Sequence, residues 1–418
     1  MELKKYRLSD IAKIEISGVD KKTKEGEMPV RLCNFVDVYH NWAITNSLYD
    51  NFMCASAKEA EIAKCSIRKG QVAITKDSET RDDIGIATYI ADDFADVLLG
   101  YHCALITPNE NILDGKYLNA FMHTSYIQKY FENNASGSGQ RYTLSNDTIS
   151  NIPILLPSLE EQQRIGAILS NIDRKIELNK AINDNLEAMA KQLYDYWFVQ
   201  FDFPNEEGKP YKSSGGEMVY NERLKREIPK GWEILHLADC LSCKTERVDK
   251  SEIQKTDFYT PIEVIPRKQM SLNETVPIEE AVSGICRYKK GNILLSNRRV
   301  YFHKVCIAPF DGLTRDTVIV LEPIRKELLA YYYETVFSEK FIAYATKHSY
   351  GSEQPVLSWS AAQKFEILKP TNQLDYKFST VVDNIIETVL NNHKEIGQLN
   401  KLRDELLPLL MNGQLTIA

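Results

Sequence analysis

The feature that most constrains this chain is a long segment with a helical pattern, from residue 158 to residue 203. Ser158 is a good N-cap, and Glu161 three residues later completes a capping box. Gly166 is the only Gly or Pro that follows before Pro204. A helix of about forty residues spans roughly 60 Å at 1.5 Å per residue. We therefore expect a spacer helix that needs a partner helix to bury its apolar side.

Apolar residues recur along this segment in two series that fit the a and d positions of one heptad register. The a series is Ile165, Ile172, Asn179, Leu186 and Leu193, and the d series is Ile168, Lys175, Ile182, Met189 and Tyr196. The pattern predicts that both series form the buried seam of a coiled coil.

The partner helix comes from an internal repeat. Pro157 and Pro370 lie 213 positions apart, and the same offset relates Asn179 to Asn392. Upstream, the stretch at 68–75 (RKGQVAIT) matches 289–296 (KKGNILLS) at an offset of 221. A constant offset along the helix and a different one before it indicate that the helices keep their register while domain loops vary in length.

The predicted fold class is α+β, with two β-rich mixed domains and two long helices. The domains are expected at 1–157 and 232–370, the helices at 158–203 and 371–418, and a polar connector at 204–231. In the first domain, strands are predicted at 30–38, 71–75, 85–90 and 103–107, and a helix at 118–131. Periodicity alone does not choose between parallel and antiparallel pairing of the long helices.

Composition narrows the classes of protein. The chain has 418 residues, 43% of them hydrophobic, and no apolar run approaches the eighteen residues of a membrane span. Eight cysteines in this length do not make a disulfide framework, which predicts a reducing cytoplasm. Cys240 and Cys243 form a lone CxxC, read as two ordinary buried thiols with zinc as the alternative. Because the net charge is −7, any DNA-binding surface must take its positive charge from a local cluster of Lys and Arg.

Catalytic motifs are absent from the sequence. It contains no phosphate-binding GxxxxGK[ST], no GxGxxG after a strand, and no element typical of amino methylation. Its histidines lack metal-ligand spacing, and acidic-x-Lys fragments at 173–175 and 375–377 fall on the long helices, where solvated helix faces are the simpler interpretation. We therefore predict a chain without catalytic residues, and without a cofactor or metal of its own.

Binding signals are stronger. Residues 286–306 carry six Lys or Arg and no acid, and the stretch 297–304 follows a predicted strand. Arginine suits guanine edges and phosphates, and Asn suits adenine. The equivalent loop of the first domain is 75–81, and the loops at 134–142 and 347–354 form a second matched pair. The predicted DNA-binding residues are Lys76, Ser78, Thr80, Arg81, Ser138, Gln140, Arg141, Tyr142, Asn297, Arg298, Arg299, Tyr301, His303, Lys304, Tyr350, Ser352 and Gln354. Solvated or plain connecting loops are the alternative interpretation.

The chain resembles the specificity subunit of a type I restriction-modification system. The residues that carry the resemblance are 152–165 (IPILLPSLEEQQRI), 197–201 (WFVQF), 228–233 (IPKGWE) and 406–415 (LLPLLMNGQL). Together with the internal repeat, these four stretches span essentially the whole chain. The second copy departs from the pattern, because Thr371-Asn-Gln-Leu stands where the first has Leu-Glu-Glu-Gln.

The resemblance implies a host-defence protein with two target-recognition domains, each reading one half of a bipartite, asymmetric site in double-stranded DNA. It implies antiparallel long helices, on which two methyltransferase subunits that bind S-adenosylmethionine dock, and two restriction subunits that use ATP with Mg²⁺ can join. Adenine methylation and cleavage would belong to those partners. The other interpretation is a coiled-coil adaptor or structural protein without sequence-specific DNA binding.

Asn179 and Asn392 are each the third of five a positions. A polar residue at such a position costs stability but penalises slipped registers. Our hypothesis is that the two asparagines fix the register of an antiparallel pair, and with it the spacing of the two half-sites.

Overall fold

The structure, a computed structural model, describes residues 3–138, 141–281 and 284–414. It divides into two compact units: unit 1 comprises Met1–Glu177 and Gln398–Ala418, and unit 2 comprises Leu178–Gly397. Each unit contains part of both long helices. This division therefore does not address the domain boundaries expected from the sequence, which stay predictions.

The main sheet of unit 1 has the strand order β2-β10-β6-β8-β4. Its strands are β2 (Ala12–Ile16), β10 (Cys103–Pro108), β6 (Val72–Thr75), β8 (Ala87–Ile90) and β4 (Ala43–Ile44). Every residue of β6 and β8 is buried, because the sheet lies inside the unit. The strands predicted near 71–75, 85–90 and 103–107 are confirmed.

Smaller sheets and short helices complete unit 1. The sheets are β5-β3-β9 (Met53–Ala57, Met28–Cys33, Val97–Leu99), β11-β12-β7 (Ser136–Ser138, Arg141–Thr143, Asp77–Ser78) and β1-β13 (Lys4–Arg7, Pro153–Leu156). The helices are α1 (Leu8–Ile11), α2 (Phe35–His40), η1 (Asn46–Asn51), α3 (Glu59–Cys65), α4 (Gly115–Met122), α5 (Ser125–Asn134) and α6 (Asn146–Ser150).

Two of the predicted elements in unit 1 are wrong in extent, and helix caps explain both. The strand expected at 30–38 ends at Cys33, because Asn34 and Asp37 form a capping box that starts α2. The helix expected at 118–131 is two helices. The Thr124 hydroxyl accepts a hydrogen bond from the Ile127 amide and starts α5.

Unit 2 repeats this framework. Its sheets are β17-β23-β20-β21 (Leu241–Cys243, Val318–Pro323, Ile293–Ser296, Val305–Ile307), β18-β22-β19 (Tyr259–Thr260, Gly312–Arg315, Ile285–Tyr288), β16-β24 (Glu233–His236, Glu366–Lys369) and the hairpin β14-β15 (Met218–Asn221, Arg226–Pro229). Its shorter helices are η3 (Leu237–Asp239), η4 (Lys250–Glu252), η5 (Ile278–Glu280), η6 (Val300–Phe302), η7 (Lys326–Leu328), α8 (Leu329–Phe337), α9 (Glu339–Lys347) and α10 (Trp359–Ala362).

Strand pairing confirms the repeat predicted from the sequence. The antiparallel series β2-β10-β6-β8 of unit 1 corresponds to β17-β23-β20-β21 of unit 2. In each unit a strand at the start of the copy also pairs with the strand that leads into a long helix, β1 with β13 and β16 with β24.

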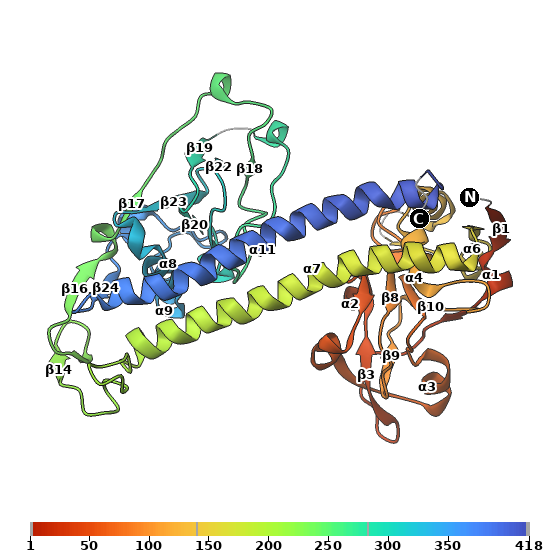
Figure 1. Ribbon diagram of the computed structural model, residues 1–418, viewed down its shortest axis with the longest axis horizontal. Helices are drawn as coiled ribbons and strands as arrows, with labels where there is room; N and C mark the ends of the chain where they lie inside the picture. Colours follow the sequence, from red (N-terminus) through yellow and green to blue (C-terminus); the bar gives the residue numbers. More distant parts are fainter. Residues whose placement is uncertain (1–2, 139–140, 282–283, 415–418) are drawn as a thin grey trace. The chain divides into compact units, whose positions relative to one another are not determined.

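The two long helices are α7 (Leu159–Tyr194) and α11 (Leu374–Met411), drawn in yellow-green and blue in Figure 1. The predicted capping box of α7 is present: the Glu161 amide donates to the Ser158 hydroxyl at 3.3 Å, and the Ser158 amide donates to the Glu161 carboxylate at 3.3 Å. A π-helical turn, η2 (Asp195–Val199), extends α7. Before α11, Asn372 and Gln373 instead adopt left-handed backbone conformations, with φ of 56° and 53°.

Within unit 2 the long helices run antiparallel. Asn179 contacts Glu395, whereas Tyr194, further along α7, has its ring 5.9 Å from that of Phe378, near the start of α11. Phe378 is fully buried, which stabilises this end of the pair by about 1.5–3 kcal/mol. In unit 1, Ile165 and Leu169 of α7 share a core with Leu407 and Leu410 of α11.

The predicted heptad is wrong in one of its two series. Residues of the d series are exposed, with Ile182 at 38% and Met189 at 57% exposure. The buried positions beside the a series are Leu169, Ile176, Asn183 and Ala190, each one residue after a d position. The globular part of each unit also packs on the helices, as α8 does beside Ala190. Because of this second contact, the buried face of the helix is rotated by one residue from the predicted seam, and the d series stays largely exposed.

No helix in the described ranges is both long enough and apolar enough to cross a membrane.

Candidate nucleic-acid interface

The two predicted loops of the first copy come together on one small sheet in unit 1. Strand β7 carries Asp77 and Ser78, which pair with Thr143 and Tyr142 of β12. The next strand, β11, pairs with β12 on its other side. The sheet therefore brings residues 77–78 beside residues 142–143, with 136–138 on the next strand, although they are about sixty positions apart in the sequence.

Several predicted DNA-binding side chains cluster on this sheet. Arg141 is exposed, and Tyr142 is half-buried. The Arg81 guanidinium lies 5.2 Å from the centre of the Tyr142 ring, a cation–π distance. Lys76 and Ser78 are partly exposed, and Thr80 is exposed. Gln140 lies outside the described residues, and of Ser138 only the backbone is described.

Asp77, which the sequence did not single out, is the centre of this cluster. Its carboxylate accepts a hydrogen bond from the Thr143 hydroxyl and lies 2.5 Å from His102 Nδ1, 3.3 Å from Arg141 Nη2 and 3.4 Å from Lys76 Nζ. Burial raises the pKa of Asp77, but the hydrogen bonds from Thr143 and His102 and the charges of Lys76 and Arg141 outweigh burial, so its pKa lies below the usual value.

A pocket of about 520 Å³ opens beside this cluster. Asp77, His102 and Arg141 line it together with Phe35 and Tyr39 of α2, whose rings stack 5.7 Å apart. The pocket thus combines aromatic faces with hydrogen-bonding groups of both kinds, the mixture that recognition of nucleobases uses.

The matching loops of unit 2 come together in the same way. The Leu357 amide donates to the Asn297 carbonyl at 2.8 Å, and in unit 1 the Leu144 amide donates to the Lys76 carbonyl, also at 2.8 Å. Arg298 then forms a β-bridge with Val356, which bridges to Tyr350. In both copies, therefore, an equivalent backbone bond joins the two loops, a contact that the sequence did not predict.

The second loop pair presents exposed polar and aromatic side chains. Arg298, Ser352 and Gln354 are exposed, Tyr301 is 49% exposed, and Tyr350 is 64% exposed. Arg267, absent from the predicted set, adds a guanidinium 4.1 Å from the Phe302 ring. It lies outside the basic stretch at 286–306, so charge counting along that stretch did not find it.

Three predicted side chains of this loop are engaged by the protein itself. Asn297 Nδ2 donates to the Asp316 carbonyl at 2.9 Å, and Lys304 Nζ donates to the Ile262 carbonyl at 2.7 Å. His303 is 3% exposed, with Nε2 2.7 Å from the Phe337 carbonyl, and burial lowers its pKa. This placement corrects the expectation of a direct DNA contact by His303 and gives the three residues a loop-shaping role.

The backbone of the loop at 297–304 is strained at Arg299 and His303. Arg299 and His303 have φ of 47° and 55°, the left-handed region that side chains with a Cβ rarely adopt. Each costs about 1–2 kcal/mol. The buried ring of His303 and the packing of Phe302 beneath Arg299 and Arg267 hold this shape. In this shape Arg298 is exposed just after the end of β20, whereas Arg299 is half-buried over Phe302.

Asn179 and Asn392 both make hydrogen bonds across the helix pair. Asn179 Nδ2 donates to the Glu395 carboxylate at 2.7 Å, and Asn392 Nδ2 donates to Asn183 Oδ1 at 2.8 Å. Asn179 is 2% exposed. The two bonds lie one helical turn apart, which fits the role in helix register that we hypothesise.

An apolar groove runs along the helices of unit 2 and occupies about 570 Å³. It lies over the exposed d series, and its lining residues are Met189, Gln192, Leu193, Asp195, Tyr196, Gln200, Val381 and Ile385. Met189 and Val381 are 57% and 50% exposed. Such a surface on helices is typical of a site for another protein chain.

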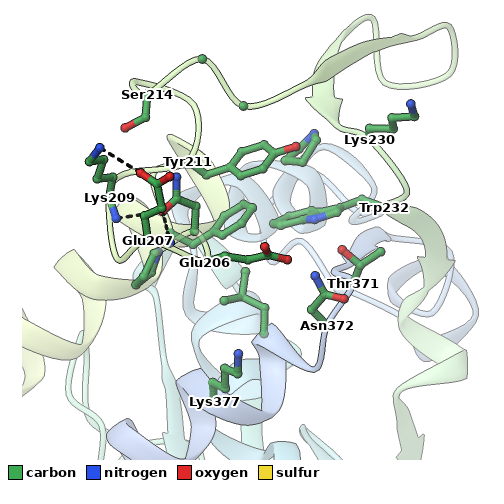
Figure 2. Close-up of a pocket in the computed structure, with 17 residues that line it drawn as sticks. Glu206, Glu207, Lys209, Tyr211, Ser214, Lys230, Trp232, Thr371, Asn372 and Lys377 are labelled. Atoms are coloured by element: carbon green, nitrogen blue, oxygen red, sulfur yellow. Dashed lines mark hydrogen bonds and ion pairs between the residues drawn. The ribbon is translucent and has the colours of Figure 1, made fainter.

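A second hollow of unit 2, about 620 Å³, lies where α11 begins. Figure 2 shows Trp232 and Tyr211 along one side and Thr371, Asn372 and Lys377 along the other. The ring of Phe203 stacks between Tyr211 at 4.6 Å and Trp232 at 5.4 Å. Tyr211 of this wall comes from the connector, and the hollow lies beside Thr371, where the second copy departs from the capping box of the first.

Comparison with known proteins agrees with a duplicated DNA-recognition fold. The family described as "Type I restriction modification DNA specificity domain" matches residues 1–188 and 229–401. Since these ranges cover most of the chain, the chain belongs to this family. It is the DNA-specificity component of such a system and not its catalytic one.

Curated relatives carry the same description. The chain is 28% identical over 384 residues to the type I restriction enzyme MjaIX specificity subunit of Methanocaldococcus jannaschii, covering 86% of this chain and 81% of the relative. It is 25% identical over 409 residues to the HindI specificity subunit of Haemophilus influenzae, covering 84% and 88%. The crystal structure of a type I S subunit from M. genitalium covers 98% of this chain and 96% of its own, with a TM-score of 0.59 at 15% identity, which supports the fold.

Proposed function

We propose that this chain directs methyltransferase and restriction subunits to a bipartite, asymmetric DNA site, with each recognition domain reading one half-site in the DNA grooves. The observation that carries the proposal is the duplicated loop pair, anchored by Leu144 to Lys76 in one unit and by Leu357 to Asn297 in the other. The backbone frame is shared, but the side chains on it differ. Two similar readers with different side chains suit two different half-sites.

In the first half-site the proposed contacts come from Lys76, Ser78, Thr80, Arg81, Ser138, Gln140, Arg141 and Tyr142. In the second they come from Arg298, Arg299, Tyr301, Tyr350, Ser352 and Gln354, with Arg267 added. Arginine and glutamine suit purine edges in the major groove, and the tyrosines suit sugar and base faces. The basic stretch at 286–306 supplies local positive charge in a chain whose net charge is −7.

The proposed partners are double-stranded DNA and two methyltransferase subunits, which two restriction subunits can join. The groove over Met189 and Val381 supports docking of a methyltransferase subunit on the helices of unit 2. Leu402 and Leu409 of α11, at 43% and 36% exposure, are exposed apolar side chains in unit 1. A second methyltransferase subunit is proposed to dock there.

The chemistry belongs to those partners. S-adenosylmethionine would bind the methyltransferase subunits, and ATP with Mg²⁺ the restriction subunits, while this chain holds neither. Its proposed place is the cytoplasm, where its free thiols stay reduced.

The decisive experiment is co-expression with a methyltransferase subunit of the same type I system, in a host without other adenine methylation. We expect the two chains to elute together, and genome-wide methylation mapping to give one motif made of two unlike halves and an unread gap. A complex that neither binds nor methylates DNA at a defined motif contradicts the proposal and favours a plain adaptor.

A further inference from the structure

Asp77 is a nearly buried acid in a surface proposed to read DNA, which is chemically unexpected because DNA is itself an anion. We propose that Asp77 is a positioning residue that holds Arg141 ready for a base edge of the first half-site and releases it when DNA binds. This inference rests on the proposed function of the loop pair. It concerns a group that the sequence pattern did not identify.

Arg141 can leave Asp77 easily. Its side chain is 61% exposed, and its Nη2 lies 3.3 Å from the Asp77 carboxylate, at the long end of hydrogen-bond distance. Because the guanidinium side of this ion pair is solvent-exposed, the pair contributes little to stability. A planar guanidinium that is already oriented, however, loses less freedom when it meets the paired acceptors of a guanine edge.

Asp77 remains satisfied after Arg141 has left. The carboxylate is 7% exposed, and it keeps the Thr143 hydroxyl on one oxygen and His102 and Lys76 on the other. Removing the arginine therefore leaves no uncompensated buried charge, which would otherwise be costly. These partners also fix where the carboxylate points.

His102 joins the two groups. Its Nδ1 lies 2.5 Å from the Asp77 carboxylate and 2.8 Å from Arg141 Nη2. One ring nitrogen can donate a proton to the acid or accept one from the arginine, but it cannot do both at once. The Lys76 amide donates to the His102 carbonyl at 2.8 Å, so this ring is held against the loop.

The cluster of Asp77, His102 and Arg141 belongs to the recognition domain of the first copy. The matching bonds of Leu144 and Leu357 align Lys76 with Asn297 and thus Asp77 with Arg298. An acid in one copy therefore stands where the other has a base. The Asp77 charge repels the phosphates of any DNA, since like charges repel. A correct base for Arg141 offsets this repulsion, so DNA without that base is disfavoured.

The test uses the complex of the full chain with its methyltransferase partner, after the motif has been mapped. Binding is measured to a duplex with the motif, to duplexes with single changes in each half-site, and to one without the motif. For Asp77→Asn we expect discrimination at the first half-site to fall by about tenfold, with tighter binding to DNA without the motif and an unchanged second half-site. Glu132→Gln on α5 is the matched control, because it removes one exposed acid of unit 1 that does not line this pocket.

A double variant separates positioning from general charge. If Asp77 acts through Arg141, Asp77→Asn adds no loss of discrimination to Arg141→Gln. Wild-type discrimination by a folded Asp77→Asn complex overturns the inference, as does a fully additive loss in the double variant. A wild-type complex without any motif preference instead refutes the proposed function, and the two failures are thereby distinguished.

Discussion

At the scale of single residues, Arg298 is the side chain of the second loop pair with the most freedom to meet DNA. It is exposed, and its backbone is held by the bridge to Val356 and by the bond from Leu357 to Asn297. Its neighbour Arg299 is half-buried above Phe302. The pair therefore divides into an arginine that can reach out and one that supports the loop.

We predict that Arg298→Ala relaxes base choice in the second half-site at a cost of about 1–3 kcal/mol, the range for a lost bidentate contact. Methylation mapping and binding to single-base variants of the motif measure this change. Lys290→Ala removes an exposed charge elsewhere in the basic stretch and serves as the control. An unaltered motif with unaltered affinity speaks against a base contact.

Glu334 of α8 shows what a buried acid does when no cation compensates it. It is 2% exposed, and burial, with Asp195 and Glu187 nearby, raises its pKa to about 8 against a smaller opposite effect of Lys191. Burial also raises the pKa of Glu187 to about 7. Both carboxyls are therefore mainly or partly neutral near pH 7.

The raised pKa makes the stability of unit 2 dependent on pH. Below pH 4.5 the Glu334 carboxyl is protonated in both the folded and unfolded states. As pH rises from there through about 8, the unfolded state releases its proton first, so the free energy of unfolding falls. We predict that Glu334→Gln removes this fall and raises stability above pH 8 by a few kcal/mol at most, at about 1.4 kcal/mol per pKa unit. Urea unfolding at pH 5 and pH 8.5 tests this, with Glu222→Gln as an exposed control. Equal pH dependence in both variants counts against the buried charge.

At the scale of elements, the long helices show both the reach and the limit of sequence reasoning. Offsets between Pro157 and Pro370 were enough to predict two helices in register. Apolar identity, however, could not tell which series meets the partner, because it does not record the second contact with the globular part of each unit. Leu169 and Ala190 are buried where Ile182 and Met189 were expected.

The two asparagine bonds across the helices lead to a prediction about register. Replacing Asn179 and Asn392 together with Leu removes both bonds and makes the seam more apolar, which permits slipped pairings. We expect a changed or mixed gap in the methylated motif, or a changed oligomeric state. Asn185→Leu with Asn391→Leu is the control, since both asparagines lie exposed on the same helices. If motif and assembly stay as in the wild type, the asparagines do not set the register.

The exposed d series leads to a prediction about docking. Met189→Glu places a charge in the groove that we propose for a methyltransferase subunit, and we expect at least tenfold weaker association, since burying a methionine contributes about 1.5–3 kcal/mol. Analytical size-exclusion and titration of the two chains measure it. Tyr220→Glu on β14, at 58% exposure, introduces the same charge away from the groove and is expected to leave association unchanged. Equal effects of the two substitutions exclude the groove as the site.

At the scale of the whole molecule, the duplication separates the reading of the two half-sites. The strand series and the loop anchor recur in both copies. At the equivalent positions, however, the first copy has Lys76 and Asp77 and the second has Asn297 and Arg298. Exchanging residues 1–157 for those of a relative is thus expected to change one half of the methylated motif and to leave the other half as it was. Mapping the hybrid's motif checks this, and the converse exchange of 232–370 is the control. Changes in both halves refute independent reading.

The candidate site was predictable in its loops but not in its centre. Charge and residue type pointed to Arg141, Arg298 and Tyr350, and the repeat showed which loops correspond. Asp77 and His102 escaped notice because their meaning depends on contacts with Arg141 and Thr143, far away in the sequence. His303 was misjudged because a polar residue in a basic loop gives no sign of the buried carbonyl that it meets.

The bond from Leu144 to Lys76 and its counterpart from Leu357 to Asn297 join backbone atoms alone. A point mutation of an exposed loop side chain such as Thr80, Arg81 or Arg298 therefore alters what is read while these backbone bonds stay in place. For a protein whose value to its host lies in distinguishing its own DNA from foreign DNA, this arrangement makes new specificities accessible by small heritable steps. Each step leaves a folded chain that still assembles with its partners.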